Sequence, residues 1–114
     1  MESILNSIKK MLGISEDDDS FDVDIIIHIN TALMTLTQLG VGPPDGFRIE
    51  DEIPEWGDFI SADSKQYEAV KTYMYLKVKL VFDPPLSSAV LVSMEQMAKE
   101  YEWRLNNAVE TATS

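Results

Sequence analysis

Residues that could do chemistry are few in this chain of 114 residues, and they lack the partners that catalysis needs. His28 is the only histidine and there is no cysteine, so a metal ion would lack its usual nitrogen and sulfur ligands. The serines have no plausible base beyond His28, and no G-x-S-x-G turn is present. Gly40-Val-Gly42 leads into prolines instead of a helix, which argues against a nucleotide-binding loop. We therefore expect no catalytic residue, no cofactor and no metal ion, and hence no enzyme.

Carboxylates are the most abundant reactive groups, and their densest run is Glu16-Asp17-Asp18-Asp19. A calcium loop of the EF-hand type would need a glycine at its turn and a glutamate closing twelve residues, and neither stands at the required position. Together with Ser20 and Asp22, the run precedes a predicted helix, whose N-terminus favours negative charge and side-chain caps. We interpret the run as a solvated capping loop.

The charge balance argues against sequence-independent binding of nucleic acid. Twenty acidic residues against nine basic ones give a net charge of −11, so the long-range field repels phosphate backbones. The first ten residues lack the pattern of a signal peptide, and no apolar stretch is long enough to span a membrane. The missing signal peptide and the absence of cysteine predict a bacterial cytoplasm, or a particle assembled there, as the location.

The elements that must carry these residues centre on the apolar segment from Ala69 to Phe82, which Asp83-Pro84-Pro85 closes. Its alternating pattern is typical of a strand, and strand and helix compete for it. The length of the segment, the stop at the prolines and a capping pattern of Asp63 with Gln66 favour a helix. The residues predicted to face inward are Val70, Tyr73, Met74, Val78 and Val81.

Three further helices follow from apolar spacing and terminal signals. The first spans Ile4 to Leu12 after Ser3, and the second runs from Val23 to Leu39 and ends at Gly40. The last begins at Ser87 or Ser88, and Glu100, Glu102 and Arg104 form its outward face, while Trp103 lies off the buried stripe. That stripe comprises Leu91, Met94, Ala98, Tyr101 and Leu105.

The predicted fold is therefore all-α, a small bundle of four main helices in one domain over residues 1–114. An irregular acidic insertion, residues 41–62, separates the second helix from the third. Trp56, Phe59 and Ile60 should pin the insertion to the body, because aromatic side chains in an acidic loop would otherwise be exposed. Residues 107–114 have little to bury, which predicts a flexible tail.

In this order, several segments resemble the head-to-tail connector, or adaptor, proteins of long-tailed phages and prophages, also called head-completion or DNA-packaging proteins. The segments are Glu16 to Asp24, Thr37-Gln-Leu-Gly-Val-Gly-Pro43 with Gly46-Phe47, Tyr73 to Pro85, and Ser93-Met-Glu through Glu102-Trp-Arg-Leu105. The resemblance implies a helical virion subunit that forms a ring of about a dozen copies. Such a ring sits between the portal protein and a tail-side head-completion protein, DNA passes through it without specific binding, and no catalysis is implied.

A closed ring requires heterologous contacts, in which one face of a subunit meets a different face of its neighbour. We expect basic and aromatic side chains of the third and last helices to meet the acidic insertion of the next copy. The candidates are Tyr75, Lys77, Lys79, Trp103 and Arg104 on one side, and Glu50, Asp51, Glu52, Glu55 and Asp58 on the other. The alternative is a small acidic helical binding module, such as a DNA mimic that occupies a nucleic-acid-binding protein.

Overall fold

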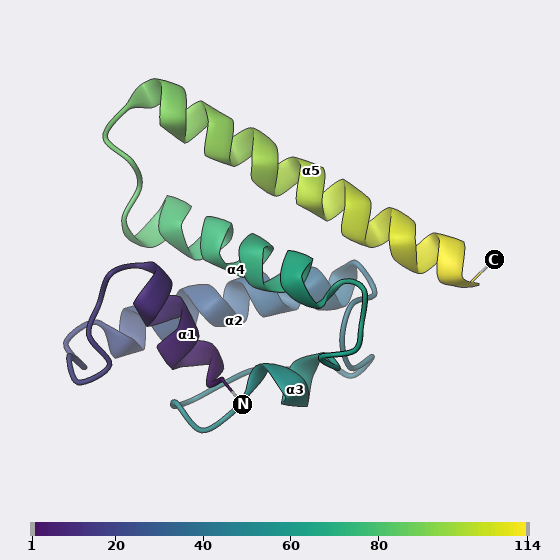
Figure 1. Ribbon diagram of the computed structural model, residues 1–114, viewed down its shortest axis with the longest axis horizontal. Coiled ribbons are helices and arrows are strands. Elements are labelled where there is room, and N and C mark those ends of the chain that lie inside the picture. Colours follow the sequence, from purple (N-terminus) through teal and green to yellow (C-terminus); the bar gives the residue numbers. More distant parts are fainter. Residues whose placement is uncertain (1, 114) are drawn as a thin grey trace.

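The central helix α4 (Tyr67–Phe82) lies between α2 (Asp22–Gln38) and α5 (Ser88–Thr113), as Figure 1 shows. A computed structural model describes residues 2–113, and of these the side chains up to Ala108. The other two helices are α1 (Ile4–Met11), which contacts α2 and α4, and the short α3 (Trp56–Phe59) inside the insertion. The described part of the chain contains no strand, so the all-α prediction is confirmed. The insertion differs from the prediction only in carrying a helical turn of its own.

The apolar segment from Ala69 to Phe82 is a helix, and the competing strand interpretation is wrong. Val70, Tyr73, Met74 and Val78 are fully buried, as predicted. Val81 is not, because 61% of its surface is exposed. Leu86 and Val90, which lie at the same end of the α4–α5 pair, are exposed as well. The last turn of α4 is therefore covered only on the side of Phe82, which packs against Phe21 and His28 at the α2 end. The periodicity of a helix predicts which way a side chain points, but it does not predict where the covering helix diverges.

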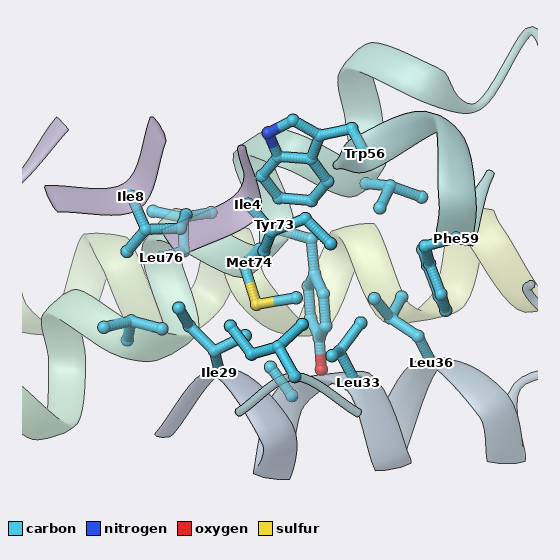
Figure 2. Packing of buried hydrophobic residues seen from close by; sticks show 14 of the residues in the cluster. Ile4, Ile8, Ile29, Leu33, Leu36, Trp56, Phe59, Tyr73, Met74 and Leu76 are labelled. Atoms are coloured by element: carbon cyan, nitrogen blue, oxygen red, sulfur yellow. The ribbon is translucent and has the colours of Figure 1, made fainter. Parts of the chain in front are cut away.

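The core forms where four helices and the insertion converge (Figure 2). Ile29, Leu33 and Leu36 of α2 face Tyr73 and Met74 of α4 across the centre. Burying each such side chain contributes about 1.5–3 kcal/mol relative to leaving it in water. Ile4 and Ile8 of α1, Leu76 of α4, and Trp56 and Phe59 of α3 complete the cluster drawn in the figure. The core is thus assembled from segments far apart in sequence.

Helix α1 begins as its sequence predicts, because the Ser3 hydroxyl accepts a hydrogen bond from the Asn6 amide at 3.2 Å. Its Lys9, however, is almost completely buried, and the Lys9 Nζ lies 2.9 Å from an Asp22 carboxylate oxygen. The same ammonium donates a hydrogen bond to the Glu16 carbonyl at 3.1 Å. One lysine therefore joins α1, the acidic loop and the start of α2. Asp22 therefore pairs with Lys9, and the predicted side-chain cap of α2 is absent, since its N-cap residue Phe21 makes no such bond.

The insertion is fixed to the helices at two places, by hydrogen bonds at Ile49 and by packed side chains between Trp56 and Ile60. The Asn30 side chain of α2 accepts a hydrogen bond from the Ile49 amide at 2.8 Å and donates one to the Ile49 carbonyl at 2.9 Å. Trp56 and Phe59 are buried and Ile60 packs against the core, which confirms the predicted anchoring. Gly42 has a φ of +84°, and a Cβ there would collide with the Phe59 ring. The chain thus needs a glycine where the insertion leaves α2.

Two predicted helix ends differ from the structure. Helix α4 begins only at Tyr67, and its N-cap Gln66 makes no side-chain cap bond, so the Asp63 and Gln66 capping pattern is wrong. The Ser61 and Ser64 hydroxyls stabilise turns there instead. Helix α5 continues as helix to Thr113, and its last described buried side chain is Leu105. The looseness predicted for residues 107–114 stays a prediction, and most of those side chains lie outside the described part.

Candidate subunit-contact surfaces

The lysines predicted to meet a neighbour are already paired within the subunit. Lys77 Nζ lies 3.6 Å from a Glu102 carboxylate oxygen, and Lys79 Nζ lies 2.8 Å from that of Asp83. The two lysines point to different sides of α4, because residues two apart are about 200° apart around a helix. Tyr75 is half-buried against the core. Lys77 and Lys79 therefore do not form one continuous basic surface on α4.

Glu102 was predicted to face outward, and this prediction is wrong. Its carboxylate accepts a hydrogen bond from the Tyr73 hydroxyl at 2.7 Å and also pairs with Lys77, so it joins α5 to α4. Burial raises the pKa of the Tyr73 hydroxyl well above its ordinary value of 10.0, and the Glu102 carboxylate raises it further. The i, i+3 and i+4 spacing of apolar residues in α5 does not predict this contact. A glutamate counts as a polar residue in such a pattern whether it faces solvent or another helix.

This buried hydroxyl predicts a specific loss of stability in alkali. The folded chain keeps the Tyr73 proton, whereas the unfolded chain loses it near pH 10, so the free energy of unfolding falls as pH rises above about 10. Tyr73→Phe should remove up to about 1.4 kcal/mol per pH unit from that slope. It should also lower stability at neutral pH by about 1.5–3 kcal/mol, because a hydrogen bond to a charged group is lost.

Urea unfolding at several pH values above and below 10 measures this effect. Tyr75→Phe is the matched control, because Tyr75 lies on the same helix and its hydroxyl has no carboxylate partner among the contacts described. Equal alkaline slopes for the wild-type chain and Tyr73→Phe would rule out this account of the hydroxyl.

The two predicted residues on α5 are exposed, and of these Arg104 already has a partner within the subunit. Trp103 is 67% exposed, and the neighbouring Arg104 donates a hydrogen bond to Glu100 at 2.6 Å on the surface. Helix α5 packs mainly against α4, so its opposite side is uncovered (Figure 1). Val92 and Trp103 are eleven residues apart and lie on this outer side. We call the residues Val92, Gln96, Lys99 and Trp103 the α5 outer stripe.

The acidic residues predicted as the opposing surface lie on the insertion. Glu50, Asp51, Glu52 and Asp58 are exposed, and Glu55 is half-buried. Two of them already have local partners, since Glu55 and Asp58 form a reciprocal capping box around α3. Glu52 and Glu55 also line an open pocket of about 680 Å³ with Glu2 and Glu16, beside α1. The acids thus gather near α1, apart from Trp103 and Arg104.

A second uncovered surface, which the sequence analysis missed, lies on the outer side of α2. Val23, Ile27 and Met34 are exposed, and with Asn30 they follow the spacing i, i+4, i+7 and i+11. Asn30 itself is half-buried, because the Ile49 backbone of the insertion binds its side chain. We call these four residues the α2 outer stripe. An open groove of about 620 Å³ surrounds Met34, and Phe47, Asp45 and Arg48 of the insertion form its other side. The apolar steps of four and seven were present in the sequence, but the buried stripe of the same helix dominated the pattern.

The single histidine, possible metal ligands and the hydropathy of the helices are the remaining features. His28 stacks edge-on against Phe82, with ring centroids 6.5 Å apart, as part of the packing between α2 and α4. Within residues 2–113, no group of three or more histidine or acidic side chains is arranged to hold a metal ion. No described helix combines the length and apolar character needed to cross a bilayer.

Comparison with known proteins gives one family. No curated protein and no solved structure matches the chain. A family model described as phage connector protein matches residues 4–112, which is nearly the whole chain and includes all five helices but the end of α5. The chain therefore belongs to the phage connector protein family.

Proposed function

We propose that this chain is a head-to-tail connector subunit that forms a ring between the portal and a tail-side head-completion protein. Family membership indicates a structural component of a phage particle that contacts other head or tail proteins. The ring, its place between those two proteins and its assembly in the host bacterial cytoplasm are the proposed parts. About a dozen copies is the size that the family resemblance suggests.

The observation that carries the proposal is the exposure of α5. A helix of 26 residues packs mainly on one neighbour and leaves Trp103 in solvent. Large aromatic side chains are enriched at protein interfaces and dominate their binding energy. A second apolar surface, on the far side of α2, gives the subunit two different faces for two neighbours. Two unlike faces suit a ring, whose contacts are heterologous.

The charge of the chain suits the proposed passage of DNA. A net charge of −11 repels phosphates, so a ring of such subunits would let DNA slide without adhering. The acidic run at Glu16 to Asp19 and most acids of the insertion are exposed, which places much of this charge at the surface. The same acidity would serve a DNA mimic, the alternative function.

Electron microscopy of the purified chain at increasing concentration tests the proposal. A connector subunit should form rings of one size, whereas a DNA mimic should stay monomeric or dimeric and bind a basic protein. Reversing the charges of Lys77 and Lys79 tests the proposed contact with the acidic insertion. Unchanged assembly in that variant would exclude these lysines from the interface and leave the ring itself in place.

A further inference from the structure

We propose that adjacent subunits are joined by the α5 outer stripe of one copy packing along the α2 outer stripe of the next, with Trp103 inserted in the groove beside Met34. This inference rests on the ring assembly proposed above and names the surfaces that build it. Helices α2 and α5 both turn their buried sides toward α4, so their outer stripes face away from it in different directions. One copy therefore presents each surface to a different neighbour.

The two stripes match in length and spacing. Each follows i, i+4, i+7 and i+11, from Val23 to Met34 on α2 and from Val92 to Trp103 on α5. Eleven residues of helix extend about 16 Å, which is three turns. Stripes of this spacing allow two helices to pack side by side at a small crossing angle. In the parallel register, Val92 meets Val23 while Trp103 meets Met34.

The groove suits an indole ring chemically. Met34 is 57% exposed at its centre, and a methionine sulfur packs favourably against an aromatic ring. Arg48 on the far side can lie over the ring face, and Phe47 adds apolar contact. Thr37 and Gln38 also line the groove, and their side-chain oxygens can accept a hydrogen bond from the indole N–H when it is removed from water.

The rims of the two surfaces are complementary in charge. Trp103 is flanked by Glu100 and Arg104, and the groove is bordered by Asp45 and Arg48. The groove thus offers one acid and one base, and the α5 side offers the same pair plus Lys99 of the stripe itself. In the docked arrangement Glu100 can pair with Arg48 of the next copy, and Arg104 with its Asp45. Such rim pairs add orientation more than affinity, which leaves Trp103 as the anchor.

Substitutions on the two surfaces test the contact. Trp103→Ala and Met34→Lys should each weaken self-association at least about thirtyfold, because truncating or blocking an interface anchor has effects of this size. Ile53→Ala is the matched control, since Ile53 is 75% exposed on the insertion and lies outside both stripes. Circular dichroism should show unchanged helix content in all three variants. Rings that form normally from Trp103→Ala would overturn this inference and leave the ring proposal standing, whereas a wild-type chain that stays monomeric would overturn both.

Cross-linking through introduced cysteines tests the register. The chain has no native cysteine that could form a competing disulfide. A chain carrying both Val23→Cys and Val92→Cys should form a ladder of disulfide-linked multimers on oxidation, because each copy is joined to two different neighbours. Either single variant should give no ladder. Products that stop at the dimer would show a two-fold contact instead, and would contradict head-to-tail packing of these stripes.

Discussion

Trp56→Ala should lower the free energy of unfolding by about 3–5 kcal/mol, which is much of the stability of an ordinary small domain. Trp56 is fully buried, and it joins the insertion to α1 and α4 (Figure 2). The backbone reinforces that junction, because the Trp56 amide donates to the Glu2 carbonyl at 3.1 Å and the Ile4 amide donates to the Pro54 carbonyl at 3.0 Å. Removing the indole leaves a cavity where three segments meet, and the rigid surroundings cannot fully collapse into it.

A second variant at this position separates packing from hydrogen bonding, and an exposed residue nearby serves as the control. The Trp56 indole nitrogen has no protein acceptor among the described residues, so Trp56→Phe gives up volume but no hydrogen bond. Its expected loss is about 1–2 kcal/mol. Ile53→Ala, three residues earlier and exposed, should change stability by less than about 0.5 kcal/mol. Urea unfolding followed by circular dichroism measures all three, and a Trp56→Ala chain as stable as Ile53→Ala would contradict the buried role of the indole.

Lys9→Ala should lower the free energy of unfolding by about 2–4 kcal/mol, although lysine substitutions usually matter little. The ammonium of Lys9 holds the Asp22 carboxylate and the Glu16 carbonyl, and the aliphatic stem of this side chain is buried in the core. Without it, Asp22 keeps a negative charge at a position where only 26% of its side chain is exposed. Residual access to water at Asp22 keeps the loss below that of a fully buried pair.

Lys10→Ala is the matched control, because Lys10 is the next residue in α1 and is exposed. Its expected change is below about 0.5 kcal/mol. Adding Asp22→Ala to Lys9→Ala should cost less than the sum of the single substitutions, because the second change removes a charge that the first left unpaired. Additive losses in chemical unfolding would show that the pair contributes nothing and that the stem accounts for the effect.

The sequence predicted the helices better than it predicted their partners. The start of α1 after Ser3, the bounds of α2 to within one residue and the anchoring by Trp56 and Phe59 follow from local spacing and composition, and all are confirmed. The helical nature of α4 was predicted from segment length, the two prolines and the Asp63 and Gln66 capping pattern, because its apolar pattern also fitted a strand. The helix is confirmed, although the capping pattern is wrong. These features depend on residues near one another in the chain.

Apart from the Asp63 and Gln66 capping pattern, which is a local signal, the errors concern contacts between distant segments. The inward position of Glu102 depends on the Tyr73 hydroxyl, 29 residues away. The exposure of Val81 depends on where α5 diverges from α4. The burial of Lys9, for which no prediction was made, depends on its contacts with Glu16 and Asp22. The outer stripe of α2 was missed for a related reason: an apolar residue in a helix can face the core or a partner, and only the packed subunit distinguishes the two. Spacing alone carries no such information.

The mass of the purified wild-type chain in solution, measured by native mass spectrometry across a range of concentrations, tests the central claim most directly. A connector subunit should shift from monomer to one closed oligomer of fixed copy number, near a dozen, without accumulating open intermediates at high concentration. The Trp103→Ala chain should require a concentration at least about thirtyfold higher for the same shift. A wild-type chain that remains a monomer or dimer at every concentration would contradict ring assembly.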